Sequence, residues 1–188
     1  MSVETPLVDT VVETYVADVL DALEEAGVTV LGAYLTGSVA TGDFDPETSD
    51  LDVVAVIDRP LASEDRKRLV EAIGRLGCPA RALELVAYVR GNQPPDLELN
   101  VNASAADSAE VEAPTHWFVI DAGMAQERIP AWKDYFDPIS EERLREAVVS
   151  SLAWSKEWPE LEFARLNAAR ARHYLEHGEW LSKQEANR

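Results

Sequence analysis

Apolar residues recur along the chain at two spacings, and each spacing predicts a different kind of element. In residues 6–26 they return every three or four positions, which is typical of a helix that buries one face. Pro6 suits the first turn of this helix and Gly27 suits its end. The same spacing predicts further helices over 63–76, 140–157 and 160–177, and the beginning of another at Ser182.

Four shorter segments have the β-branched or alternating pattern of strands. They cover residues 28–35, 51–57, 80–89 and 97–102. Residues 37–49 are dense in Gly, Asp, Ser and Thr and predict a turn and loop, with a short helical turn beginning at Ser38. Residues 103–115 are small and acidic and predict a loop, whereas 116–121 fit either a strand or the beginning of a helix.

The order of these elements predicts an α+β fold in two parts. Strands mixed with helices come first, and helices alone follow the sequence FDPIS at 136–140. We therefore expect a first domain over 1–138, built on a mixed sheet, and an all-helical domain over 139–188.

Charge and composition narrow the classes of partner. The 188 residues are 46% hydrophobic and 28% charged, which is globular composition, and the net charge is −18. Binding to nucleic acid or to an anionic membrane needs clustered Lys and Arg, so the sequence disfavours both. The charge suits a polycationic ligand or a site that gathers metal ions, although solubility alone also explains it.

The small numbers of cysteine and histidine and the absence of long apolar runs argue against several kinds of metal site and against a membrane protein. Cys78 is the single cysteine, so neither an intramolecular disulfide nor a Cys-cluster metal site is expected. Three histidines leave little for a His-rich metal site, and no apolar run has the length of a membrane helix. The N-terminal sequence does not resemble a signal peptide, so we expect a cytoplasmic protein.

Two carboxylates begin the strand predicted at 51–57. Asp50 and Asp52 are two positions apart, so their side chains leave the same face. Lys and Arg are absent from residues 1–58, so no local cation neutralises the two charges. A divalent cation would do so, and an all-oxygen ligand set favours Mg²⁺ over Zn²⁺.

Gly37-Ser38 and Glu84 complete a candidate site. Gly37-Ser38 follows a predicted strand, where backbone N–H groups and a hydroxyl can face an anion. An anion site beside a metal site suggests a nucleoside triphosphate. Glu84 stands alone in an apolar strand, where it can bind the metal or accept a proton. Each feature alone also fits a solvated turn or strand end, but their combination in this order favours a site.

This pattern resembles the nucleotidyltransferase superfamily with the DNA polymerase β-like fold. Leu35-Thr36-Gly37-Ser38, the spacer, Asp50-Leu51-Asp52-Val53 and the later Glu84 match its motif. Over about residues 28–188 the chain is similar to the streptomycin/spectinomycin adenylyltransferases. RALELVAYV, FDPISEERL and LNAARARHYLEHGEWLSKQEA carry that narrower resemblance.

The resemblance implies a role for each matching residue. It implies that Asp50, Asp52 and Glu84 meet Mg²⁺ and that Glu84 deprotonates a hydroxyl of a cationic antibiotic. The residues that it implies for ATP are Gly37, Ser38, Ser49, Arg170 and Lys183. Glu160 is the nearest match to an acidic residue that the family uses for the acceptor.

The chain departs from this branch in two places. The family's tryptophan after the fourth strand falls in Asn102-Ala103-Ser104, so spectinomycin is favoured over streptomycin. Family members usually continue with more helices beyond the position of Arg188, which implies a shortened or cut helical domain.

We therefore expect a Mg²⁺-dependent enzyme that transfers AMP from ATP to such an acceptor. The alternatives are a related enzyme with another small-molecule or protein acceptor, or a non-catalytic binding module of the same fold. The sequence leaves the oligomeric state open.

Overall fold

The computed structural model describes residues 10–42, 44–91, 97–181 and 183–187 in two compact units. The first unit spans 1–92 and 96–112, and the second spans 93–95 and 113–188. The division comes earlier than the boundary predicted at 138, because α4 (Thr115–Arg128) packs against α5 (Glu141–Glu157) within the second unit. Residues 6–9 of the first predicted helix and Ser182 lie outside the described residues.

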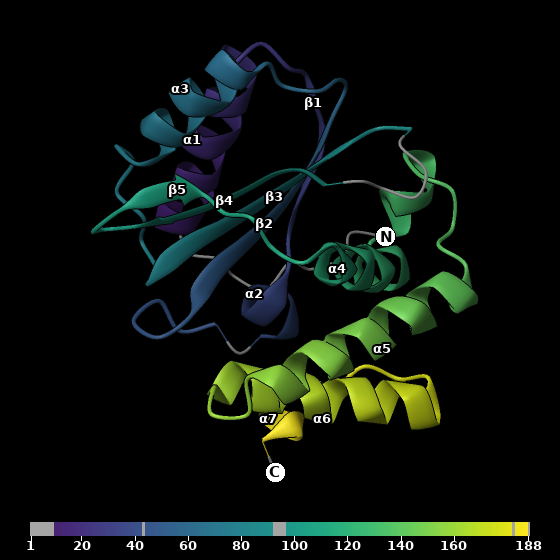
Figure 1. The fold of residues 1–188 in the computed structure, drawn as a ribbon. Helices are drawn as coiled ribbons and strands as arrows, with labels where there is room; N and C mark the ends of the chain where they lie inside the picture. Colours follow the sequence, from purple (N-terminus) through teal and green to yellow (C-terminus); the bar gives the residue numbers. More distant parts are fainter. Residues whose placement is uncertain (1–9, 43, 92–96, 182, 188) are drawn as a thin grey trace. The chain divides into compact units, whose positions relative to one another are not determined.

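The first unit is built on a five-stranded mixed sheet (Figure 1). Its strands are β1 (Val30–Leu35), β2 (Asp50–Ile57), β3 (Ala82–Val89), β4 (Leu97–Ser104) and β5 (Ser108–Glu110), in that order across the sheet. β2 and β3 are parallel, and the other neighbours are antiparallel. The four predicted strands are confirmed, with ends shifted by two residues at most.

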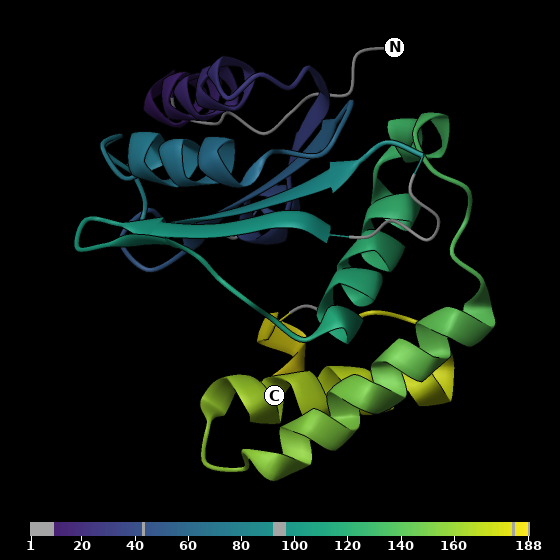
Figure 2. The ribbon, with the colours of Figure 1, turned by 45° about the horizontal axis from the view of Figure 1, so that its top comes forward.

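Two helices, α1 (Thr10–Glu25) and α3 (Ser63–Ile73), cover one face of this sheet (Figure 2). Alternate residues of the central strands, such as Leu51 and Val53 of β2, are buried against them. Because side chains alternate along a strand, Asp50 and Asp52 lie on the opposite face. The apolar core therefore fixes which face of the sheet carries the acids.

The segments predicted as loops hold two short elements. α2 (Gly37–Thr41) follows β1, as expected for a helical turn near Ser38. The loop predicted at 103–115 is wrong in part, since it contains the end of β4 and all of β5. β5 has no apolar alternation of its own and is held by pairing with β4, where Ala103 faces Ser108.

The second unit is helical. It contains α4, a 3₁₀ turn η1 (Pro130–Asp134), α5, α6 (Glu162–His177) and α7 (Lys183–Ala186). Of the two possibilities for 116–121 the helix is confirmed, and it continues to Arg128. Ser140 caps α5, its hydroxyl accepting the Arg143 N–H at 3.3 Å. No helix in the described ranges combines the length and the apolarity needed to cross a membrane.

Candidate active site

Strand direction brings the predicted motif together at one end of the sheet. β1 runs antiparallel to β2, so the end of β1 lies beside the beginning of β2, and Leu35 pairs with Val53. The backbone N–H of Thr36 donates to the carbonyl oxygen of Asp52 at 3.0 Å. The Gly37-Ser38 turn, which follows directly, therefore starts next to Asp52.

Gly37 and the Asp52 carboxylate are in close contact. Gly37 has φ +55°, in the left-handed region that favours glycine. A Cβ added there would lie 1.7 Å from Oδ2 and 2.6 Å from Cγ of Asp52. Glycine is thus required for two independent reasons, the backbone angle and the space that the carboxylate occupies.

Asp52 and Glu84 are direct neighbours across the parallel strands. Asp52 pairs in register with Glu84, and Glu84 pairs with Asn102 of β4. Residues in register on neighbouring strands point to the same face, with strands about 4.8 Å apart. One row of polar side chains, Asp52, Glu84 and Asn102, therefore crosses three strands on the face opposite the core.

Asp50 has a basic partner that the sequence did not reveal. Arg81, one residue before β3, donates from Nε to Oδ1 at 2.9 Å and from Nη2 to Oδ2 at 2.5 Å. The hydrogen bonds and the charge of Asp50 raise the pKa of the Arg81 guanidinium. The sequence has no cation near Asp50 along the chain, and its basic partner comes from 31 positions away, through the parallel register of β2 and β3.

This pairing affects the fit to a metal ion. Among the described residues, no three Asp, Glu, His or Cys side chains gather closely enough to hold a metal. The donor set nevertheless suits Mg²⁺, since Asp50 and Asp52 share a face and Asp52 has Glu84 as its neighbour in register. Assembly of the three acids requires Asp50 to leave Arg81.

The two predicted serines have different settings. The Ser38 hydroxyl oxygen is shielded from solvent within α2. The Ser49 hydroxyl accepts the N–H of Asp45 at 3.2 Å, and its carbonyl oxygen accepts the N–H of Arg81 at 3.2 Å. Ser49 thus ties the loop before β2 to the beginning of β3.

Arg170 of α6 is held inside the helical unit. Its Nε donates to the carbonyl oxygen of Leu181 at 2.9 Å, and Nη2 lies 3.5 Å from Sδ of Met124. Burial lowers the pKa of the Arg170 guanidinium, and the nearby charge of Asp121 partly opposes this shift. A desolvated cation of this kind is stabilised by an anion, whether a carboxylate or a phosphate.

The other two predicted residues of the helical unit give less information. Lys183 begins α7, but its side chain lies outside what the structure describes. Glu160 is exposed in the turn between α5 and α6. Neither position tests the role implied by the resemblance.

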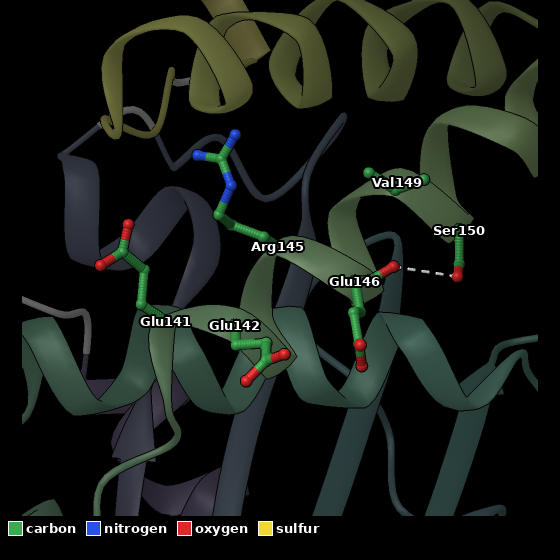
Figure 3. A pocket seen from close by; sticks show the side chains of 6 residues that line it. All are labelled: Glu141, Glu142, Arg145, Glu146, Val149 and Ser150. Carbon is green, nitrogen blue, oxygen red and sulfur yellow. Dashed lines mark hydrogen bonds between the residues drawn. The ribbon is translucent and has the colours of Figure 1, made fainter.

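A hollow of about 690 Å³ lies on α5, and none of the predicted residues lines it (Figure 3). It is lined by Glu141, Glu142, Arg145, Glu146, Val149 and Ser150. All six residues belong to one helix, and Arg145 reaches the Leu175 carbonyl oxygen at 3.4 Å. A surface that a single helix lines does not enclose a ligand, so we do not assign it to the reaction.

Sequence reasoning missed Arg81 as a member of this site, and it treated Asn102 only as a lost tryptophan position. Neither could have been found from periodicity, because Arg81 and Asn102 are brought to the acids only by the register of β2, β3 and β4. Both residues lie far from Asp52 along the chain, so no sequence motif around Asp52 indicates them.

Comparison with known proteins agrees with the fold. Residues 16–83 match the family model described as "Nucleotidyltransferase domain", a span that includes Gly37, Asp50 and Asp52. The structure is similar to that of the spectinomycin adenyltransferase AAD(9) from Enterococcus faecialis, crystallised with ATP and spectinomycin. The TM-score is 0.68 at 18% sequence identity, covering 93% of this chain and 79% of that chain. No curated protein matches the chain significantly in sequence. The chain therefore resembles nucleotidyltransferases in motif and fold, and the expected α+β class is confirmed.

Proposed function

We propose that the protein is a Mg²⁺-dependent enzyme that transfers AMP from ATP to a hydroxyl group of a cationic aminocyclitol or aminoglycoside. One observation carries this proposal. The Asp52 carboxylate fills the space above Gly37, and Glu84 is its neighbour in register on the parallel strand. A glycine turn with two acids beside it on one sheet face could hold a metal ion and the phosphates it binds, which is the positioning that phosphoryl transfer uses.

Asp50 and Asp52 would hold the ion, with Glu84 at its edge. Mg²⁺ bound there would offset charge on the phosphate oxygens. Asp52 is already turned toward the Gly37 backbone, so its orientation does not depend on the ion. Asp50 has to exchange Arg81 for the ion.

Glu84 is assigned the role of general base. It accepts the proton of the acceptor hydroxyl while that oxygen forms a bond to the α-phosphorus. The bond between the α-phosphorus and the bridging oxygen breaks, and pyrophosphate leaves with the electron pair. The pairing of Glu84 with Asp52 supports this role, because a base there would lie close to a phosphate held by an ion on Asp52.

The remaining predicted residues would bind the nucleotide. Gly37 and Ser38 offer the turn, Ser49 lies just before the acids, and Arg170 and Lys183 are cations of the helical unit. Arg170 is a desolvated cation, with Asp121 as a nearby anion, and a phosphate would supply further negative charge.

The acceptor is proposed from charge and from one lost aromatic residue. The net charge of −18 attracts a cationic acceptor, with Glu160 as a candidate contact. Asn102-Ala103-Ser104 has no aromatic side chain for stacking, which favours spectinomycin over streptomycin. The similar structure with spectinomycin supports the same choice.

The ion pair between Asp50 and Arg81 favours one alternative, a non-catalytic binding module of the same fold. Such a module would have no need to release Asp50 for a metal. A third possibility, the same chemistry on another small-molecule or protein acceptor, differs only in the acceptor.

Pyrophosphate release tests the proposal against these alternatives. We expect release from ATP and Mg²⁺ in the presence of spectinomycin, less with streptomycin, and none for Asp52→Asn. Release only with an unrelated acceptor would keep the proposed chemistry but contradict the proposed acceptor. An Asp52→Asn variant as active as the wild type, or no release with any acceptor, would favour the binding module.

A further inference from the structure

The contact between Arg81 and Asp50 has the geometry of a fixed two-point pair. Two nitrogen atoms of the guanidinium face the two carboxylate oxygens, at 2.9 Å and 2.5 Å. A planar guanidinium matches a carboxylate in this way, and such pairs are stronger than single contacts. Both oxygens through which Asp50 could bind a metal are thereby engaged.

The backbone fixes where Arg81 stands. Ala82, the next residue, pairs in register with Asp50, and the Arg81 N–H donates to the Ser49 carbonyl oxygen at 3.2 Å. The base of the Arg81 side chain is therefore held beside the beginning of β2. The register of the sheet thus places the two residues side by side, so the pair does not depend on the conformation of a distant loop.

The guanidinium is nevertheless able to move. The Arg81 side chain is 61% exposed and that of Asp50 is 26% exposed. Leaving Asp50 would carry the guanidinium into water without opening the core. A partly exposed pair of this kind has a small net energy, so a divalent cation or a phosphate can compete with it.

We propose that Arg81 is a built-in counter-ion that occupies the carboxylate of Asp50 until a divalent cation and its triphosphate replace it. The inference rests on the proposed function. In the metal-free protein Arg81 offsets the charge of Asp50 beside Asp52. When the metal takes Asp50, the released guanidinium gains the phosphates as new partners. Arg81 is thus a positioning residue that makes metal binding depend on the nucleotide.

Manganese binding without nucleotide is the direct test, with Mn²⁺ replacing Mg²⁺ and unbound Mn²⁺ measured by electron paramagnetic resonance. Arg81→Gln should bind Mn²⁺ about fivefold more tightly than the wild type, the upper end expected for a partly exposed pair. Arg81→Lys should lie between them, because lysine keeps the charge but loses the two-point contact. Arg75→Gln is the control, since it removes the same charge from an exposed pair with Glu71.

Thermal unfolding gives a second readout. Without metal, Arg81→Gln should melt at a lower temperature than the wild type. Addition of Mn²⁺ should raise the melting temperature of the variant by more than it raises that of the wild type. If Arg81 had a purely structural role, Arg81→Gln would lower the melting temperature equally with and without Mn²⁺. Its affinity for Mn²⁺ would then be the same as that of the wild type.

The outcomes separate this inference from the proposed function. Equal or weaker Mn²⁺ binding by Arg81→Gln would overturn the role of Arg81, while Asp52-dependent binding in the wild type would leave the proposed function standing. No Mn²⁺ binding by any variant, even with ATP, would overturn both.

Discussion

At the scale of single residues, the contact between Gly37 and Asp52 joins the fold to the proposed chemistry. The left-handed backbone of Gly37 turns the chain from β1 into α2, and the missing side chain leaves room for the Asp52 carboxylate. A larger residue would have to displace the acid or the turn. The same atom that would bind a metal thus limits what the sequence can place at position 37.

We expect Gly37→Ala to abolish nucleotide turnover and to lower the free energy of unfolding by about 1–3 kcal/mol, since backbone strain and overlap with Asp52 add. Gly91→Ala is the matched control, because Gly91 has φ +82° but no atom of the described residues lies within 4 Å of an added Cβ. It should lower the free energy of unfolding by about 1 kcal/mol and retain turnover. Urea unfolding measures both, and equal losses would contradict the proposed contact.

The acids were predictable at this scale, and their pairing was not. Asp50, Asp52 and Glu84 stand out in the sequence because charges at the beginning of, or inside, apolar strands are costly. The partner of Asp50 depends on the relative register of β2 and β3, which periodicity does not define. Sequence alone therefore locates the carboxylates but not their counter-ion.

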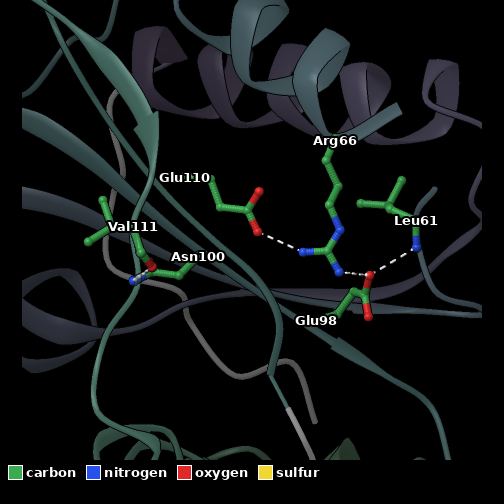
Figure 4. A network of polar contacts seen from close by, with 6 residues as sticks. All are labelled: Leu61, Arg66, Glu98, Asn100, Glu110 and Val111. Atoms are coloured by element: carbon green, nitrogen blue, oxygen red, sulfur yellow. Dashed lines mark hydrogen bonds and ion pairs between the residues drawn. The ribbon is translucent and has the colours of Figure 1, made fainter. Parts of the chain in front are cut away.

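At the scale of elements, an ion-pair network joins α3 to the edge of the sheet (Figure 4). Arg66 contacts Glu98 of β4 and pairs with Glu110 of β5 at 2.6 Å. The strand register shifts between Ala87 and Tyr88, which leaves Glu98 outside the regular pairing. Glu98 thus reaches α3, and its carboxylate also accepts the Leu61 N–H at 3.0 Å.

Arg66→Gln should lower the free energy of unfolding by about 1–3 kcal/mol, because the Glu98 side chain is only 10% exposed and would lose its cation. Arg75→Gln removes an exposed ion pair with Glu71 just after the end of α3 and should cost less than about 1 kcal/mol. Chemical denaturation compares the two. If Arg66→Gln lowered the free energy of unfolding no more than Arg75→Gln does, the Glu98 carboxylate would have to be solvated by water in place of its lost cation.

The long elements were predictable at this scale, whereas β5 and the division between units were not. Helices and strands with a strong apolar period form where the sequence indicates. β5 has three residues and is stabilised only by its neighbour β4. The division lies before α4 because that helix packs against α5, with Gly123 next to Leu144, a contact that local composition does not report.

At the scale of the whole molecule, acidity and one half-buried histidine shape the response to pH. Burial lowers the pKa of His116, and its Nε2 is shielded and has no hydrogen-bond partner among the residues that the structure describes. The unfolded chain therefore binds a proton more readily than the folded one. Stability is full above the ordinary pKa of about 6.5 and falls as the pH drops through the lowered folded value.

We expect the melting temperature of the wild type to fall between about pH 7.5 and pH 5, and to fall less for His116→Gln, since glutamine does not titrate. The difference between the two curves isolates the histidine from carboxylates, which titrate mainly below that range. Parallel curves would show that the folded protein accepts the proton on His116 without cost.

The most direct test of the proposed chemistry is mass spectrometry of spectinomycin after incubation with ATP, Mg²⁺ and either the wild type or Glu84→Gln. We expect the wild type to add one AMP to the antibiotic, and the variant to bind ATP normally but to leave the antibiotic unmodified. Modification by Glu84→Gln at the wild-type rate would contradict the role of Glu84, and an unmodified antibiotic in both reactions would contradict the proposed acceptor.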